Sequence, residues 1–189
     1  MMKIAVGITG ASGAIYAQQL LRALQSNYPA SVTEVGMVLS ANAKIVWQWE
    51  LGNENYNDFP FQIWDKNNFM APIASGSAGW DALIICPASM GILGRIAAGI
   101  SDDLLTRGAD VMLKERKKLI VVPRETPYNL IQINNLKTLT EAGAIVVPAT
   151  PSFYSRPQTF EQLADTVVHR IVDLLQLPNQ TYRWSEKSK

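Results

Sequence analysis

The chain has few of the residues that several common protein classes depend on. It holds one cysteine, Cys86, and one histidine, His169, among 189 residues. One cysteine excludes an internal disulfide and is typical of a reducing cytoplasm, and so few thiol and imidazole groups exclude a Cys/His metal cluster. Lys and Arg number 17 against 16 Asp and Glu, a net charge of +1. This balance gives no electrostatic basis for binding nucleic acid or an anionic membrane.

The sequence also lacks the apolar segments that direct a chain into a membrane. No apolar run approaches the roughly 20 residues of a transmembrane helix. The first residues, MMKIAVGITGASG, have neither the apolar core nor the cleavage region of a signal peptide. We therefore expect a soluble cytoplasmic protein, and its 48% hydrophobic composition is enough to fill the core of one domain.

Short apolar segments alternate along the chain with amphipathic ones. The apolar segments predict strands at 3–8, 33–39, 81–86, 118–122 and 144–148. The amphipathic segments predict helices at 13–27, 41–50, 89–98, 101–116, 129–142 and 159–176. Strands and helices in this order predict an α/β fold in which right-handed crossovers build a parallel sheet covered by helices on both faces.

Two segments depart from this alternation. Residues 52–80 are rich in Asn, Gly, Ser and Pro, which predicts loops with one short strand at 61–64. Loops of that length in a compact domain are often functional. Residues 179–189 are polar and charged, and we expect them to form a tail after a domain at 1–178, ordered only if something packs on Trp184.

The stretch LIVVPRETP at 119–127 carries charges directly after a buried strand. Four apolar residues are followed by Arg124 and Glu125, which lie between Pro123 and Pro127. The carboxyl ends of parallel strands open onto the ligand crevice, so both charged side chains are expected at its mouth. Taken alone, the segment is explained equally well as an exposed turn with two solvated charges.

Three predicted strands are followed by a serine at the start of a helix. Ser12 lies in GITGASGA at 7–14, whose glycines let a ligand approach the backbone and whose helix N–H groups suit a phosphate; Ser40 and Ser89 follow the next two long strands. Each serine could be a helix cap, but three at one sheet edge favour a phosphate-bearing ligand. The glycine spacing fits neither dinucleotide nor Walker patterns, and no tyrosine has a lysine four residues on, so hydride transfer is disfavoured.

Basic residues on the predicted helix 101–116 have two interpretations. Arg107 and Lys114 are seven residues apart and share one face, where they could bind an anion. Ion pairs with Asp103 and Asp110, four residues earlier in each case, would instead make that face an ordinary solvated surface.

The last predicted helix, 159–176, carries a second candidate cation. Arg170 points along the edge of the apolar stripe, where a guanidinium needs an anionic partner. His169 falls with Asp165 and Asp173 on the opposite face, where a solvated or interface histidine is the better interpretation. The histidine is therefore a poor candidate for catalysis.

Together these stretches resemble the flavin prenyltransferases of UbiX type, formerly named aromatic-acid decarboxylases. The resemblance covers nearly the whole chain and is carried by GITGASGA at 7–14, Ser40 followed by Glu50, MAPIASGS at 70–77, CPASM at 86–90, ADVMLKERKKLIVVPRETP at 109–127 and PSFYSRPQT at 151–159. It implies a single-domain, three-layer Rossmann-like flavoprotein fold, related to the homo-oligomeric flavin-containing cysteine decarboxylases, whose catalytic histidine has no counterpart here. Tyr128 stands where a smaller apolar residue or phenylalanine is common.

The resemblance implies an activity and its partners. A dimethylallyl group would pass from dimethylallyl phosphate to N5 and C6 of reduced FMN without a metal. The prenylated FMN would serve a separate decarboxylase, in ubiquinone biosynthesis or aromatic acid decarboxylation, and the enzyme would be a homo-oligomer, a dodecamer, with sites between subunits. Two alternatives are a flavin-dependent decarboxylase of a carboxylic substrate and an FMN-binding carrier without chemistry.

The resemblance also assigns roles to individual positions. The FMN-binding positions are Gly10, Ala11, Ser12, Ser40, Ser89, Met90, Gly91, Ile92 and Arg124. The donor-binding positions are Arg107, Lys114, Tyr154 and Arg170. The positions assigned to catalysis are Ser12, Glu50, Glu125 and Lys114.

A site from which an allylic phosphate departs needs two kinds of group. Cationic and hydroxyl donors must stabilise the leaving phosphate, which Lys114, Tyr154 and Arg170 can do. An aromatic surface must lie beside the allylic cation, which the flavin face can supply together with Trp80 from the loop 66–80.

Overall fold

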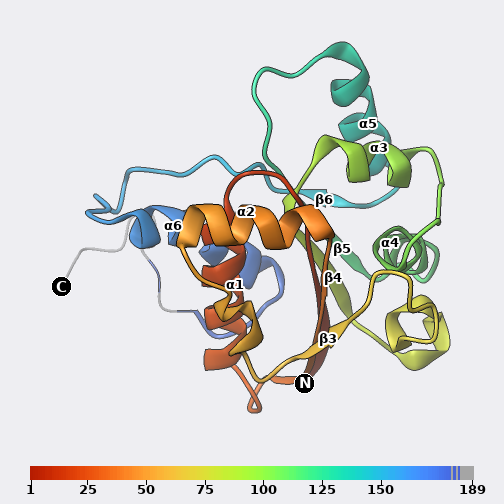
Figure 1. Ribbon diagram of the computed structural model, residues 1–189, viewed down its shortest axis with the longest axis horizontal. Coiled ribbons are helices and arrows are strands. Elements are labelled where there is room, and N and C mark those ends of the chain that lie inside the picture. The colour runs from red at the N-terminus through yellow and green to blue at the C-terminus, as the bar shows by residue number, and fades with distance from the viewer. Residues whose placement is uncertain (180, 182, 184–189) are drawn as a thin grey trace.

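The computed structural model describes residues 1–179, 181 and 183. These residues form a six-stranded parallel sheet with helices on both faces (Figure 1). Along the chain the strands are β1 (Met2–Ile8), β2 (Val32–Leu39), β3 (Gln62–Trp64), β4 (Ala82–Ala88), β5 (Lys118–Pro123) and β6 (Ile145–Val146). Across the sheet their order is β3-β2-β1-β4-β5-β6, the Rossmann arrangement, in which the strand order reverses between β1 and β4. The predicted α/β fold is confirmed.

The α-helices of the described residues all correspond to predicted ones. They are α1 (Ala14–Ser26), α2 (Ala41–Leu51), α3 (Met90–Ala97), α4 (Leu104–Lys114), α5 (Leu130–Glu141) and α6 (Phe160–Leu174). The short strand expected at 61–64 is present as β3. The strand expected at 144–148 is shorter, since β6 covers only Ile145–Val146. Beyond it the chain stays beside β5, because the N–H groups of Val147 and Ala149 donate to the Val121 and Pro123 carbonyls at 2.8 and 3.0 Å.

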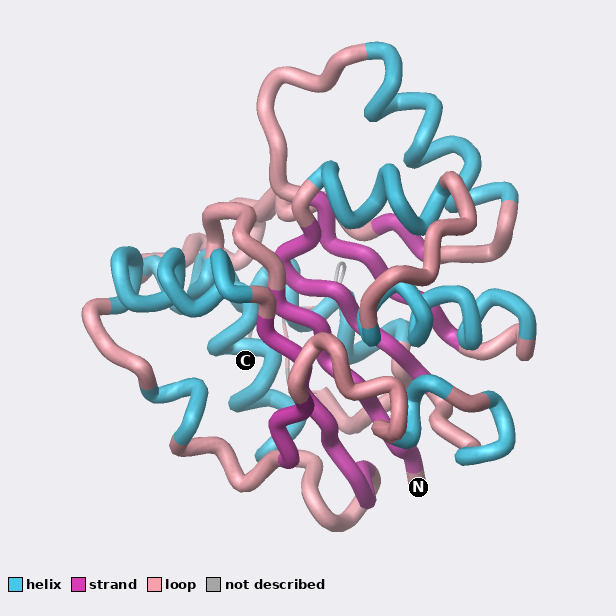
Figure 2. Tube along the Cα trace, turned by 45° about the vertical axis from the view of Figure 1, so that its right-hand side comes forward, coloured by secondary structure: helices cyan, strands magenta, loops and turns pink. Residues whose placement is uncertain are grey.

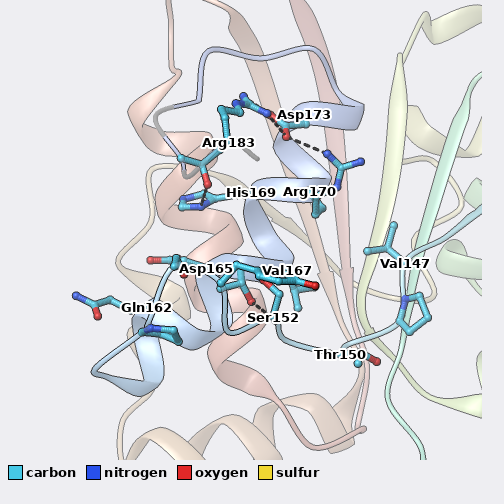
Figure 3. Close-up of a pocket in the computed structure, with 16 residues that line it drawn as sticks. Val147, Thr150, Ser152, Gln162, Asp165, Val167, His169, Arg170, Asp173 and Arg183 are labelled. Atoms are coloured by element: carbon cyan, nitrogen blue, oxygen red, sulfur yellow. Dashed lines mark hydrogen bonds and ion pairs between the residues drawn. The ribbon is translucent and has the colours of Figure 1, made fainter. Parts of the chain in front are cut away.

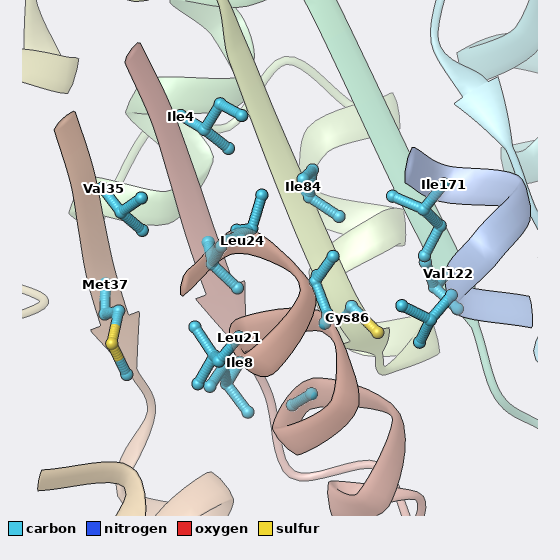
Figure 4. Close-up of a cluster of buried hydrophobic side chains, with 14 of the residues drawn as sticks. Ile4, Ile8, Leu21, Leu24, Val35, Met37, Ile84, Cys86, Val122 and Ile171 are labelled. Atoms are coloured by element: carbon cyan, nitrogen blue, oxygen red, sulfur yellow. The ribbon is translucent and has the colours of Figure 1, made fainter. Parts of the chain in front are cut away.

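Alternate side chains of the central strands enter two hydrophobic cores. Ile4 and Ile84 point to the face covered by α1 and α6, and Figure 4 shows this core between the sheet and α1. Ala5 and Leu83 point to the other face, where α3 and α4 cover them. Burial on both faces explains why these strands are almost continuously apolar.

Apart from β3, the segment 52–80 consists of loops and short helical turns (Figure 2). Its 3₁₀ turns are Asn55–Asn57, Pro72–Ala74 and Gly76–Ala78. Trp80, expected as an aromatic surface for the allylic cation, is 4% exposed and lies edge-on against Trp64 with ring centroids 5.2 Å apart. That expectation is wrong, because Trp80 is part of the core.

The chain after α6 folds back onto that helix. The side chain of Asn179 donates to the His169 carbonyl at 3.0 Å, and Arg183 pairs with Asp173. Trp184, on which the order of the tail was expected to depend, lies outside the described residues. No helix in the described part of the chain is long and apolar enough to cross a membrane.

Candidate functional site

Strand ends place the expected flavin-binding residues along one edge of the sheet. Ser12 follows β1, Ser40 follows β2, Ser89 follows β4 and Arg124 follows β5. The Arg124 backbone N–H donates to the Ala88 carbonyl at 3.3 Å, and its Nε donates to the Ser12 carbonyl at 3.0 Å. Arg124 therefore ties the end of β5 to the end of β4 and to the turn between β1 and α1, as its expected place at the crevice mouth requires.

A buried hydroxyl that the sequence analysis missed joins two of these strand ends. Thr9 is 4% exposed, and its Oγ1 donates to the Pro87 carbonyl at 2.7 Å. The same oxygen accepts from the Ser89 N–H at 2.8 Å. Thr9 thus fixes the turn that carries Ser89. The sequence feature that could have identified Thr9 is a hydroxyl residue between an apolar strand and a glycine.

The serines at the strand ends have different roles. Ser40 is the N-cap of α2, where its Oγ accepts from the Ala43 N–H at 3.1 Å. Ser89 holds the N-cap position of α3, but its hydroxyl accepts no hydrogen bond from the first turn of that helix. Ser12 is exposed, and Gly13, with a φ of 110°, takes the N-cap position of α1. The cap interpretation is correct for Ser40 and wrong for Ser12.

Glu50 supplies the cap of α1 from another helix. Its Oε2 accepts from the N–H groups of Gly13 at 2.8 Å and Ala14 at 2.7 Å, and its Oε1 accepts from Gly13 at 3.1 Å. The geometry follows from α2, which lies across the N-terminal end of α1 and carries Glu50 in its last turn (Figure 1). The expectation that the α1 N-terminus offers free N–H groups to a phosphate is therefore wrong, since this carboxylate occupies them.

Two glycines at this edge have different reasons for lacking a side chain. A Cβ on Gly10 would lie 2.5 Å from Cβ of Asn42, so α2 can pack on this turn only if residue 10 is glycine. Gly91, in the first turn of α3, is exposed, and no heavy atom of the described residues lies within 4 Å of an added Cβ. Gly91 therefore borders open space. The other expected flavin contacts are buried side chains that offer a ligand little besides backbone groups: Ala11, Met90 and Ile92.

The remaining groups at this edge differ in exposure. Glu125 is exposed, and its Oε1 accepts from the Thr126 N–H at 3.0 Å. Tyr16 of α1 is half-buried; burial and nearby Cys86 raise the pKa of its phenol, and nearby Arg124 opposes them. Burial also raises the pKa of the Cys86 thiol, which keeps it protonated and unreactive.

The basic residues of α4 are both held by contacts with neighbouring groups. Arg107 donates from Nε to the Ala74 carbonyl at 3.0 Å and pairs through Nη1 with Asp110 at 2.6 Å. Lys114 pairs with the neighbouring Glu115. Lys114 lies four residues before Lys118, which begins β5, and is therefore near the amino ends of the strands.

The ion pairs expected for these residues are wrong. Asp103 does not pair with Arg107, because it is the N-cap of α4, where it accepts from the Thr106 N–H at 2.9 Å and pairs with Arg95. Asp110 pairs with Arg107 and leaves Lys114 to Glu115. Capping and tertiary contacts override the local spacing.

Lys114 and Arg124 cannot reach each other within one chain. They lie beyond opposite ends of β5, whose six residues span about 20 Å. A site that uses both must take them from two copies.

Tyr154 and Arg170, both expected to bind the donor phosphate, line one groove (Figure 3). The groove has a volume of about 920 Å³, within the range of small-molecule sites, and lies between α6 and the segment 147–157. The Ser152 N–H donates to Oγ1 of Thr166 at 3.0 Å and holds that segment on α6. The structure thus brings these two expected residues together.

His169 lines the same groove, so its expected place on the face opposite Arg170 is wrong. Its Nδ1 lies 2.7 Å from the hydroxyl of Thr181. Arg170 pairs with Asp173 at 3.2 Å, and its side chain is 65% exposed. Asp165 also borders the groove, and burial raises the pKa of its carboxyl.

Large apolar side chains are exposed on several elements. In the segment 52–80, Met70 is 92% exposed. Others lie on α2, where Trp49 is 85% exposed, and on α5, where Leu130 and Ile131 are each 71% exposed. Exposed apolar surface of this kind is typical of subunit interfaces.

Comparisons with known proteins agree on one family. The profile of the Flavoprotein family matches residues 1–175. The chain is 40% identical over 186 residues to the flavin prenyltransferase UbiX of Methanocaldococcus jannaschii, covering 97% of this chain and 98% of that protein. A dodecameric FMN-dependent UbiX-like decarboxylase from Escherichia coli O157:H7 superposes with a TM-score of 0.90 at 36% identity, over 96% of this chain and 99% of that one.

A third relative was solved with ligands. The structure of AnUbiX (PadA1) in complex with FMN and dimethylallyl pyrophosphate superposes with a TM-score of 0.89 at 36% identity, covering 97% of this chain and 99% of that one. Sequence, fold and coverage all agree. The chain belongs to the flavoprotein family and, within it, to the flavin prenyltransferases of UbiX type.

Proposed function

We propose that this protein transfers a dimethylallyl group from dimethylallyl phosphate to N5 and C6 of reduced FMN. The observation that carries the proposal is the similarity, over almost the full length of both chains, to a protein named flavin prenyltransferase. The groove that holds Tyr154 and Arg170 together supports it, because a phosphate leaving group needs donors of these two kinds. The bound flavin supplies the nucleophilic atoms.

FMN is proposed to bind along the carboxyl edge of the sheet. Because Glu50 occupies the N-terminus of α1, the FMN phosphate is assigned to the first turns of α2 and α3, at Ser40 and Ser89. Gly91 leaves open space beside that position, and Arg124 is fixed at the adjoining strand end. Gly10, Ala11 and Ser12 complete the proposed flavin contacts.

The donor phosphate is assigned to Tyr154 and Arg170 of one subunit. Lys114 ends α4 near the amino ends of the strands, away from the carboxyl edge that carries Arg124, so its proposed role requires that another copy supply it. Arg107, on the same helix, is assigned to that copy as well. Charged donors fixed in place before the reaction stabilise the leaving phosphate without reorganising as the bond breaks.

Proton handling is assigned to Ser12, Glu50 and Glu125. Ser12 and Glu50 meet at one turn, since Glu50 accepts from the residue after Ser12. Glu125 is exposed beside Arg124 and can exchange protons with solvent.

Three further features belong to the proposal. The reaction is proposed to proceed without a metal. The product passes to a separate decarboxylase that uses prenylated FMN. The protein works in the cytoplasm as a homo-oligomer, with one flavoprotein domain at 1–178 and a tail at 179–189.

Anaerobic incubation with reduced FMN and dimethylallyl phosphate tests the function. The released flavin should be heavier by one isoprene unit and have an altered absorption spectrum, and excess chelator should not change the yield. A flavin of unchanged mass would contradict the proposal. Loss of carbon dioxide from an aromatic carboxylic acid by this protein alone would favour the flavin-dependent decarboxylase instead.

A further inference from the structure

The residues after α6 are held on that helix by several polar contacts. Asn179 Nδ2 donates to the His169 carbonyl at 3.0 Å and to Oδ1 of Asp173 at 3.1 Å. The Thr181 hydroxyl lies 2.7 Å from Nδ1 of His169. Arg183 completes the set through Asp173. This part of the chain borders the groove that contains Arg170, since Thr181 and Arg183 both line it.

Two arginines share the carboxylate of Asp173, and they do so unequally. Arg183 donates from Nη1 to Oδ2 at 2.6 Å and from Nη2 to Oδ1 at 2.8 Å, a bidentate pair. Arg170 donates only from Nη1, to Oδ2 at 3.2 Å. Figure 3 shows both guanidinium groups directed at Asp173. The Asp173 side chain is 16% exposed, whereas that of Arg170 is 65% exposed.

The carboxylate is charged under all ordinary conditions. Hydrogen bonds from Arg183 hold the pKa of Asp173 below its usual range, although partial burial opposes this effect. Arg170 lies three residues before Asp173 on the same helix and is therefore always within reach. Without Arg183, Arg170 would be the remaining cation paired with this mostly buried carboxylate among the described residues.

We propose that Arg183 is a positioning residue for the donor site: by occupying both oxygens of Asp173, it keeps Arg170 from closing a bidentate pair with that carboxylate and leaves the Arg170 guanidinium presented to the groove. A bidentate arginine–carboxylate pair is strong and has a defined geometry. A phosphate that binds Arg170 would therefore first have to break such a pair. Arg183 removes that competition. The inference rests on the proposed role of Arg170 in binding the donor phosphate.

Arg183→Ala and the double variant Asp173→Asn/Arg183→Ala separate positioning from direct binding. If Arg183 acts through Asp173, its removal weakens donor binding and the loss of the competing carboxylate restores it. If Arg183 itself binds the phosphate, or if its loss only loosens the tail, the second substitution restores nothing. Arg183→Lys keeps the charge without the bidentate fork and should give an intermediate affinity.

The assay is calorimetric titration of dimethylallyl phosphate into the protein loaded with oxidised FMN, which binds without turnover. Arg183→Ala should weaken binding about five- to tenfold, with kcat nearly unchanged in parallel kinetics. The double variant should return to within about twofold of wild type. Lys137→Ala, which removes an exposed cation paired with Glu141 on α5, is the matched control and should bind the donor like wild type.

Two results would overturn the inference: donor affinity unchanged in both Arg183→Ala and Arg183→Lys, or a double variant as weak as Arg183→Ala. Arg170→Ala distinguishes this failure from a failure of the proposed function. If Arg170→Ala binds the donor normally, the assignment of the donor site is wrong. If Arg170→Ala binds weakly while the Arg183 variants do not follow the expected pattern, only the positioning role is wrong.

Discussion

Replacing Glu50 by alanine tests whether its carboxylate caps the N-terminus of α1. The carboxylate of Glu50 accepts hydrogen bonds from two N–H groups of α1 at distances from 2.7 to 3.1 Å. Loss of a cap costs about 0.5–2 kcal/mol, and loss of a negative charge at a helix N-terminus about 0.3–1 kcal/mol. These effects overlap, so we expect a loss of roughly 1–2 kcal/mol, a fall in Tm of about 2–8 °C for a chain of this length.

Glu50→Gln should lie between wild type and Glu50→Ala, because its amide keeps one acceptor oxygen but turns a donor toward the other N–H group. Thermal melts at one protein concentration measure all three. Glu54→Ala, at an exposed glutamate after the same helix, is the control and should melt like wild type. Inorganic phosphate should raise the Tm of Glu50→Ala more than that of wild type, because the vacated N–H groups bind anions.

A wild-type Tm for Glu50→Ala, with no added response to phosphate, would refute this reasoning. Loss of product formation by such a variant would then reflect a catalytic role alone. The melts and the activity therefore report separately on the two roles assigned to this side chain.

Four further predictions follow from the site. Gly91→Ala should be at least as stable as wild type, because alanine favours a helix by up to about 1 kcal/mol relative to glycine and the space around an added Cβ is open. The same substitution should weaken FMN binding in a fluorescence titration, and an unchanged affinity would exclude flavin from that surface. Glu125→Gln should lower mainly kcat and Arg170→Ala should raise mainly the KM for dimethylallyl phosphate; a wild-type rate for Glu125→Gln would make that residue only a neighbour of the site. The Tm difference between wild type and Asp173→Asn should persist at pH 5, begin to shrink as the pH falls below about 3.9, and disappear once the pH is below the lowered folded-state pKa of Asp173. A depressed folded-state pKa contributes stability above the ordinary value and loses it on further acidification. Light scattering at micromolar concentration should show a homo-oligomer that Trp49→Glu weakens, and a fully active monomer would contradict sites shared between subunits.

The strands and helices could be predicted because their signals are local. The apolar run before Pro123 is continuous because β5 is covered on both faces, and such runs need no knowledge of tertiary contacts. Composition could not separate the buried Trp80 from the loop around it, because its burial depends on contact with Trp64.

The site was less accessible to local reasoning. Spacing along α4 predicted an Asp103–Arg107 pair, but Asp103 is committed to capping the helix, and the Arg107 guanidinium reaches the Ala74 carbonyl, 33 residues earlier in the chain. Glu50 caps a helix that begins 36 residues before it. Contacts at such separations follow from how the helices cross. The resemblance identified candidate residues, and the structure supplied their grouping.

The central claim is that one five-carbon group becomes bonded to two atoms of the flavin. The most direct test is anaerobic incubation of the protein with reduced FMN and carbon-13-labelled dimethylallyl phosphate, followed by NMR of the released flavin. The account predicts labelled carbons bonded to both N5 and C6, with one phosphate released for each flavin converted. Labelled donor recovered intact beside unmodified FMN, at protein and donor concentrations where both ligands are bound, would contradict it.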